Sequence, residues 1–169
     1  MKRLLILAAA CAVALSVAVP ALAADYTLFG SATQESTGVK VTSDASTAAT
    51  ADDFGGVNFT VPAGTTVSSI QHLSATFQTL AGDCGTGSPR LTLTLNGDSS
   101  KYISLYFGTS PSFTSGCTGT VTQEFVGTSD ACRVDLSKVV AGKQCSTWAE
   151  AVQLLGSQTV TGISFIVDA

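Results

Sequence analysis

Positively charged residues are scarce in this sequence. Its 169 residues include 8 lysines and arginines against 12 aspartates and glutamates, and the basic residues form no run. Proteins that bind nucleic acids or anionic membrane surfaces do so largely through clustered Lys and Arg side chains. The composition therefore argues against a nucleic-acid partner and against binding to an anionic membrane.

The residues and motifs of common catalytic centres are also missing. His72 is the only histidine, and the sequence has no Cys-x-x-Cys pair, no His-Glu-x-x-His motif and no Gly-x-Ser-x-Gly motif. These absences argue against a zinc site and against a common hydrolase motif. His72 lies in a segment predicted as a strand, where a solvated or sheet-face histidine is the ordinary role. We expect a protein without catalysis, and a small secreted hydrolase is the least favoured alternative.

Long apolar runs are absent apart from one near the start of the sequence. The first residues are basic, the apolar run Leu4–Val19 follows, and Ala21–Ala23 fits the small-x-small cleavage rule. The pattern predicts an export signal over residues 1–23, cleaved before Ala24. The run is shorter than the roughly 20 residues that a spanning helix needs, so we expect no membrane span.

Removal of residues 1–23 changes the charge balance. The loss of Lys2 and Arg3 leaves 6 basic and 12 acidic residues, a net charge of −6 with the histidine neutral. Residues 24–169 are enough for one secreted domain with a proper core, and no linker or internal repeat suggests a second one.

Four cysteines remain after the predicted cleavage: Cys84, Cys117, Cys132 and Cys145. An even number in an exported chain indicates two disulfides, for which three pairings exist. We favour Cys84–Cys117 with Cys132–Cys145, because the first two cysteines flank a predicted hairpin and lead away from the same sheet edge.

That hairpin is the clearest structural pattern. Arg90–Leu95 and Tyr102–Phe107 alternate apolar and polar residues, as half-buried strands do, and Asn96-Gly97 favours a reversal between them. Setting Leu93 opposite Ile103 keeps the apolar residues on one face. This register requires a five-residue loop, or a short turn with a bulge.

The other face of the hairpin carries candidate binding residues. The same register places Tyr106 beside Arg90, and Tyr102 lies on this face as well. Exposed tyrosines on a sheet can stack on sugar rings, so Tyr102, Tyr106 and Arg90 are candidate glycan-binding residues. In the alternative, a loop or second sheet covers this face and Arg90 lies over a ring as a cation–π pair.

One helix is predicted near the end of the chain. Thr147 and Glu150 fit a capping box, the apolar residues that follow recur at helical spacing, and Gly156 is expected to end the helix in a left-handed conformation. The spacing places Trp148 in the core. The helix is therefore expected over residues 147–155.

Short alternating segments predict the remaining strands. They are Tyr26–Phe29 at an edge, a weak strand at Val39–Val41, Val57–Val61, Ile70–Leu80, Val121–Val126, Arg133–Leu136, and a central strand Thr159–Val167 with Val160 facing away from Ile163. About seven or eight antiparallel strands and one short helix predict an all-β fold, a jelly-roll-like β-sandwich. This architecture resembles secreted bacterial β-sandwich modules, many of which bind carbohydrate.

Acidic loop residues suggest a possible calcium site. Asp52 and Asp53 precede a Gly-Gly pair, and Asp83 or Asp168 could approach them. Calcium prefers carboxylate and carbonyl oxygens supplied by loops. Solvated turn aspartates are the competing interpretation, and no dedicated calcium loop is present.

We therefore expect a secreted, non-catalytic binding module for a polysaccharide or another cell-surface glycan. The main alternative is a structural or interaction protein of the cell envelope or extracellular matrix that contacts other proteins through an edge strand. Glycan binding requires an exposed Tyr102 or Tyr106, whereas the structural role predicts that these rings are buried.

Overall fold

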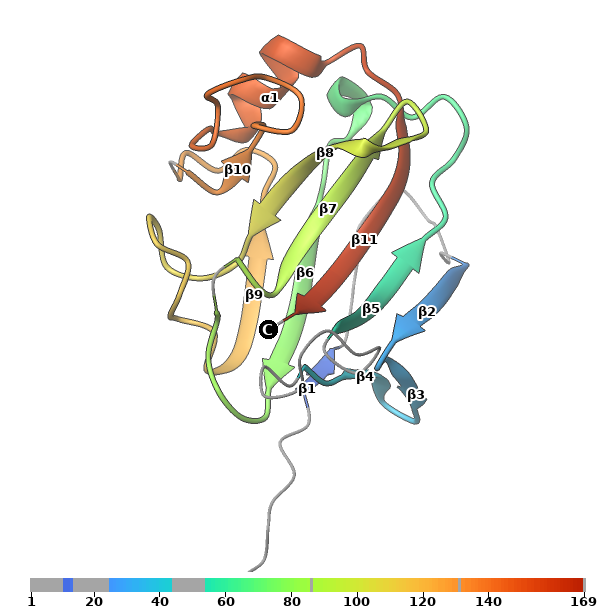
Figure 1. Ribbon diagram of the computed structural model, residues 1–169, viewed down its shortest axis with the longest axis vertical. Helices are drawn as coiled ribbons and strands as arrows, with labels where there is room; N and C mark the ends of the chain where they lie inside the picture. Colours follow the sequence, from blue (N-terminus) through green and yellow to red (C-terminus); the bar gives the residue numbers. More distant parts are fainter. Residues whose placement is uncertain (1–10, 14–24, 44–53, 86, 131, 169) are drawn as a thin grey trace, which may run out of the picture.

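The chain is mostly β-structure, with antiparallel strands and one short helix (Figure 1). A computed structural model describes the backbone of residues 11–13 and, with side chains, residues 25–43, 54–85, 87–130 and 132–168. Most of the predicted export signal lies outside the described residues.

A six-stranded antiparallel sheet, the main sheet, organises the structure. In spatial order its strands are β10 (Val134–Asp135), β8 (Asp98–Tyr106), β7 (Arg90–Leu95), β11 (Val160–Asp168), β5 (Phe54–Phe59) and β2 (Tyr26–Gly30). The predicted places of two strands are confirmed, because β2 is an edge strand and β11 lies in the centre between β7 and β5.

Two antiparallel strand pairs accompany the main sheet. They are β3 (Thr33–Glu35) with β4 (Gly38–Val41), and β6 (Ser74–Thr79) with β9 (Gly119–Glu124). The short strand β1 (Cys11–Val13) pairs with β4 and, at one position, with β6. Because β1 lies within the predicted export signal, these two pairs would be separate in a chain that has lost the signal.

The central hairpin has the predicted register. Leu93 pairs with Ile103, and the leucines of β7 are fully buried. Asn96 and Gly97 form a two-residue turn with φ values of 55° and 74°, and a register shift follows between Thr94 and Leu95. Of the two predicted connections, the short turn with a bulge is therefore the one observed.

Aromatic rings join the β6–β9 pair to the inner face of the main sheet. The ring of Phe77 on β6 lies 5.1 Å from that of Phe107 and 5.8 Å from that of Phe165 on β11, between ring centroids. Phe125 contacts Phe107 at 5.1 Å from the other side. In Figure 1 the main sheet lies in front of β6 and β9, so its opposite, outer face points toward the viewer.

One side-chain direction on β11 differs from the prediction. Val160 was expected to face away from Ile163, yet both are buried in the same core, with 1% and 6% of their surface exposed. The pairing of β11 with β7 shifts register between Val160 and Gly162. A bulge breaks strict alternation, and strict alternation was the basis of the prediction.

Helix α1 (Trp148–Leu155) has the predicted start but not the predicted end. Thr147 and Glu150 form the capping box, and Trp148 is buried, with 4% of its surface exposed. Gly156 has φ −54° and ψ −33°, a right-handed conformation. A Cβ atom there would lie 2.4 Å from the carbonyl oxygen of Val152, so a close approach explains this glycine.

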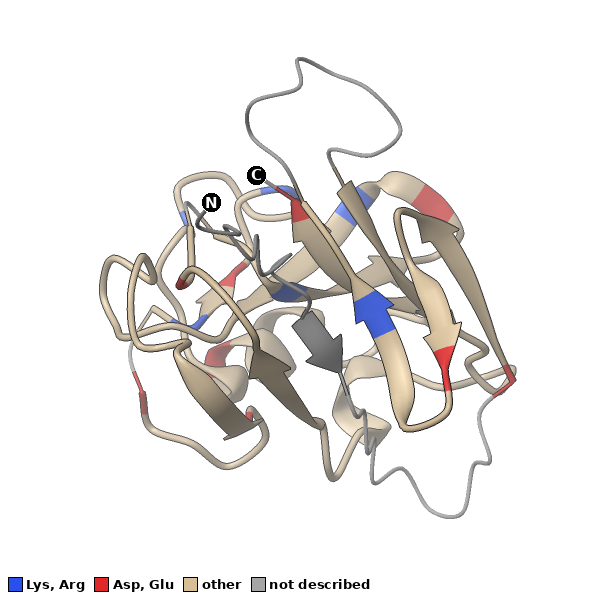
Figure 2. Ribbon diagram, turned by 90° about the horizontal axis from the view of Figure 1, so that it is seen from below, with Lys and Arg blue, Asp and Glu red and all other residues tan. Residues whose placement is uncertain are grey.

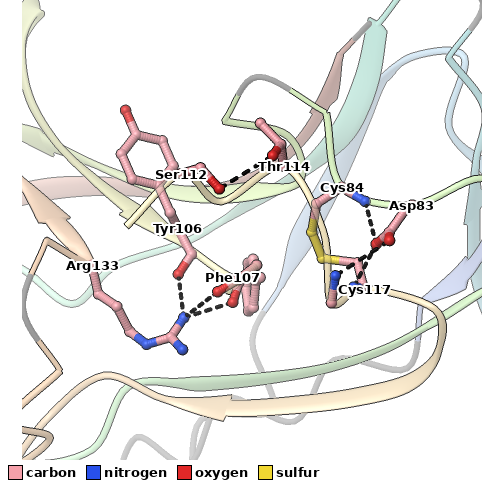
Figure 3. Close-up of a disulfide and its surroundings, with 10 residues drawn as sticks. Asp83, Cys84, Tyr106, Phe107, Ser112, Thr114, Cys117 and Arg133 are labelled. Carbon is pink, nitrogen blue, oxygen red and sulfur yellow. Dashed lines mark hydrogen bonds between the residues drawn. A yellow bond between two sulfur atoms is a disulfide. The ribbon is translucent and has the colours of Figure 1, made fainter. Parts of the chain in front are cut away.

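The disulfide pairing is the predicted one: Cys84–Cys117 and Cys132–Cys145. Two disulfides indicate an oxidising, extracytoplasmic environment. Asp83 supports the first disulfide by accepting backbone N–H bonds from Cys84 at 2.8 Å and Cys117 at 2.6 Å (Figure 3). The bond from Cys117, followed by that from Cys84, lowers the pKa of Asp83.

Among the described residues, no helix is long and apolar enough to cross a membrane.

Candidate functional site

The outer face of the main sheet carries a row of polar side chains that crosses all six strands. Residues paired in register point to the same face of a sheet, so the pairing places them side by side. We call this set the hydroxyl row; from β2 to β10 it consists of Thr27, Asn58, Ser164, Thr92, Ser104 and Asp135.

A second, shorter row lies beside the hydroxyl row. Tyr102 on β8 pairs with Thr94 on β7, which pairs with Gly162 on β11. A Cβ atom at Gly162 would have its nearest neighbour, Thr94, at 3.8 Å, an ordinary contact distance. Gly162 therefore presents no side chain on this face beside Thr94.

Exposure changes along the hydroxyl row. Thr27 and Asn58 are exposed and Ser164 is half-buried, with its hydroxyl donating to Asn58 Oδ1 at 2.7 Å. Thr92 and Ser104 are buried, with 9% and 5% of their surface exposed. The accessible part of the row therefore covers strands β2, β5 and β11. The next two residues of the row, Thr92 on β7 and Ser104 on β8, are buried.

The hydroxyl of Thr92 is unusual because it is buried without a hydrogen-bond partner among the described residues. Leaving a buried polar atom unpaired costs about 1–3 kcal/mol. Ser146 Oγ, which lies outside the two rows, is the other such side-chain atom in the described part of the chain. An unpaired group at the inner end of a polar row can accept a partner from a ligand.

Tyr102 is one of the three candidate binding residues and is half-buried on the outer face. The ammonium nitrogen of Lys138 lies 5.9 Å from the centre of its ring, and Lys138 itself is exposed. Tyr102 stands at the end of the second row and keeps part of its surface exposed, while Lys138 lies over its ring.

Tyr106 occupies a more covered position. The ring of Phe113 lies 5.3 Å away at an interplanar angle of 31°, and the backbone at Gly87 approaches the ring from the Cys84–Arg90 loop. Its hydroxyl donates to Asp135 Oδ2 at 3.2 Å. Burial, and secondly the charge of Asp135, raise the pKa of Tyr106. The surroundings of Tyr106 therefore fit the alternative in which a loop covers this face better than they fit a ring that is free to stack on a sugar.

Arg90 lies opposite Tyr106 in the sheet, as predicted, but its guanidinium binds Asp168 rather than covering the ring. A cation–π contact does occur nearby, formed by Arg133 over Phe113 at 5.8 Å. Arg133 also donates to three backbone carbonyls at the end of β8, two of which belong to the labelled residues Tyr106 and Phe107 in Figure 3. Arg133 therefore fastens the loop that covers Tyr106.

Sequence patterns could have found only some of these residues. The predicted hairpin register already places Thr92 beside Ser104 and Thr94 beside Tyr102. Lys138 and Phe113 come from loops without periodicity, and no sequence pattern places them near the sheet face.

The suggested calcium residues Asp52 and Asp53 lie outside the described residues. The two proposed helpers have other partners, since Asp168 pairs with Arg90 and Asp83 accepts backbone N–H groups. Asp83 lies near the sulfur atoms of the Cys84–Cys117 disulfide, but disulfide sulfurs are not the thiolates that bind metals.

His72 lies outside the strand in which it was predicted. The residues Val67–Ser69 form a short 3₁₀ turn, η1, and β6 begins only at Ser74. His72 is exposed on the segment between them. The neighbouring Leu73 and Phe77 are both buried in the core.

Comparison of the chain with protein-family models, curated proteins and solved structures finds no significant match. The arguments about function therefore rest on the outer face itself.

Proposed function

We propose that this protein is a secreted, non-catalytic module that binds a glycan on the outer face of its main sheet. The observation that carries the proposal is the hydroxyl row with the half-exposed ring of Tyr102 beside it. The two features together offer hydrogen bonds and a stacking surface within one face.

The chemistry of this face suits a sugar. Ser, Thr and Asn side chains can both donate and accept hydrogen bonds, as sugar hydroxyls do. A tyrosine ring offers an apolar surface with a polar tip, which fits the C–H face of a pyranose ring. Gly162 leaves room for a ring to approach the sheet between Tyr102 and Ser164.

We also propose that the mature chain begins at Ala24 and folds as a jelly-roll-like β-sandwich. The contact of Phe77 with Phe165 supports two packed layers, as does the packing of Val39 and Val41 against Val57 of the main sheet. The intact mass of the exported protein tests the first part, because cleavage before Ala24 gives one defined mass. A mass that retains residues 1–23 would refute it.

A structural or interaction role is the second candidate, and exposed aromatics at one sheet edge favour it. Tyr26 on the edge strand β2 and Phe54 on β5 have 44% and 45% of their surface exposed. An unpaired strand edge next to apolar side chains can pair with another chain. This role predicts self-association that the substitution Phe54→Ser weakens.

Affinity electrophoresis tests the proposed function. The protein is run through native gels with and without soluble polysaccharides, beside the variants Tyr102→Ala and Gln153→Ala. Gln153 is exposed on helix α1 and serves as the matched control. We expect retardation by at least one polymer, lost in Tyr102→Ala and kept in Gln153→Ala. Migration unchanged by every polymer would refute glycan binding and favour the interaction role.

A further inference from the structure

We propose that the ligand is a neutral, extended polysaccharide whose chain lies across the strands along the hydroxyl row. This inference rests on the proposed function and adds the class of polymer and the direction of its chain. Three features carry it: the spacing of the row, the lack of charge in its accessible part and the unpaired hydroxyl of Thr92.

The spacing of the row matches that of an extended sugar polymer. Neighbouring strands lie about 4.8 Å apart, and one pyranose unit advances an extended β-linked chain by a similar length. Thr27, Asn58, Ser164 and Thr92 belong to four successive strands, β2, β5, β11 and β7. They therefore span about 14 Å, enough to face roughly four sugar units. A polymer that coils, such as amylose, does not keep this alignment.

The accessible part of the row is uncharged. The accessible residues Thr27, Asn58 and Ser164 carry no charge, and neither does the buried Thr92. Lys138 lies beside Tyr102, and three other charged groups near this face have polar partners. Arg90 binds Asp168, and Tyr106 donates to Asp135. Figure 2 shows the Lys and Arg residues spread singly rather than gathered. With a net charge of −6 over residues 24–169, the protein repels acidic polymers.

Thr92 marks where the ligand meets the buried end of the row. Its Oγ1 lacks a partner among the described residues, although Ser164 and Ser104 lie beside it in register. A sugar hydroxyl bound beside Ser164 would supply that partner after a small displacement of the side chains that cover Thr92. A bound sugar would in this way pair a hydroxyl that the protein alone leaves without a partner among the described residues.

Calorimetry with a length series tests the class and direction of the polymer. Cello-oligosaccharides of two to six units are titrated into the purified exported protein, and gels are run with hydroxyethyl cellulose, arabinoxylan, polygalacturonate and soluble starch. We expect retardation by a neutral extended polymer, and affinity that rises with length up to about four units and then levels off.

The outcomes separate this inference from the proposed function. Equal affinity for two and six units, or retardation by polygalacturonate or starch alone, would overturn the extended neutral polymer and leave glycan binding standing. Retardation by arabinoxylan alone, with length dependence in xylo-oligosaccharides, would support it. No retardation by any polymer would overturn both.

Two matched variants test the role of Thr92. Thr92→Val removes the unpaired hydroxyl while keeping the shape, so we expect binding about threefold to tenfold weaker, the effect of one neutral hydrogen bond, and no loss of thermal stability. Ser146→Ala removes the other unpaired hydroxyl, away from the rows, and should leave binding unchanged. A folded Thr92→Val variant with wild-type affinity would overturn the assignment.

Discussion

Arg90 and Asp168 form a two-pronged ion pair that joins the start of β7 to the end of β11. Nη1 of Arg90 donates to Oδ1 of Asp168, and Nη2 donates to Oδ2, both at 2.7 Å. The backbone N–H of Asp168 also donates to the hydroxyl of Ser88 at 2.9 Å. The pair therefore closes one border of the outer sheet face and anchors the last described residue of the chain.

Asp168→Asn should lower the free energy of unfolding by about 1 kcal/mol, because it removes one charge from a partly exposed pair. Lys101→Ala is the control, since its ion pair with Asp98 is well exposed and should contribute almost nothing. Urea unfolding of both variants at low and high salt measures the difference. An equal loss in the two variants would contradict the anchoring role.

Glu150 makes the stability of helix α1 depend on pH. Its carboxylate accepts from the backbone N–H of Thr147 at 2.9 Å and lies 3.4 Å from Lys143 Nζ. The bond from Thr147, and then Lys143, lowers the pKa of Glu150. A lowered pKa means that the stabilisation is present above the ordinary glutamate pKa and is lost as the pH falls through the lowered value.

The variant Glu150→Gln should therefore melt below the wild type at neutral pH and approach it in acid. Melting curves from neutral pH down to below the lowered pKa of Glu150 measure this convergence. Gln153→Ala, on the exposed face of the same helix, should follow the wild type at every pH. A constant difference between Glu150→Gln and the wild type would show that the charge is not responsible.

The features that sequence predicted well are those set by neighbouring residues. The alternation of Arg90–Leu95 fixed the hairpin register, and the Thr147–Glu150 spacing located the start of the helix. The features that it missed depend on distant contacts. The cover over Tyr106 comes from Phe113 and Gly87, which belong to irregular loops and follow no period.

The same reason explains two smaller errors. Val160 faces the core because of a bulge that depends on how β11 meets β7. Gly156 was expected to supply a left-handed turn, but its backbone is right-handed, and a side chain there would meet the carbonyl oxygen of Val152 and, less closely, Ser68 of η1. Both outcomes depend on exact backbone geometry, on which the pattern of residue types has no information.

Gly156→Ala should destabilise the protein, against the usual benefit of replacing glycine in or beside a helix. The added Cβ would meet the carbonyl oxygen of Val152 at 2.4 Å and the Cβ of Ser68 at 3.3 Å. We expect a loss of about 1–3 kcal/mol in urea unfolding, as for other overpacked sites. Gly85→Ala has open space around it and should change stability little. A stabilised Gly156→Ala variant would contradict the close approach.

Tyr106 should ionise at a higher pH than an ordinary tyrosine. Burial of its ring, and secondly the neighbouring charge of Asp135, raise its pKa. A raised pKa means that the stabilisation is fully present below the ordinary tyrosine pKa and is lost as the pH rises through the raised value. Alkaline unfolding of the wild type should therefore follow ionisation of Tyr106.

Absorbance titration of tyrosinate measures this shift. We expect Tyr106→Phe to remove a step that lies above the ordinary tyrosine pKa. Tyr106→Phe should also lose less stability on going from neutral to alkaline pH, although it lacks the bond to Asp135 at every pH. If Tyr106→Phe instead removed an early step, the ring would be open to solvent. It would then offer a stacking surface, as we propose for Tyr102.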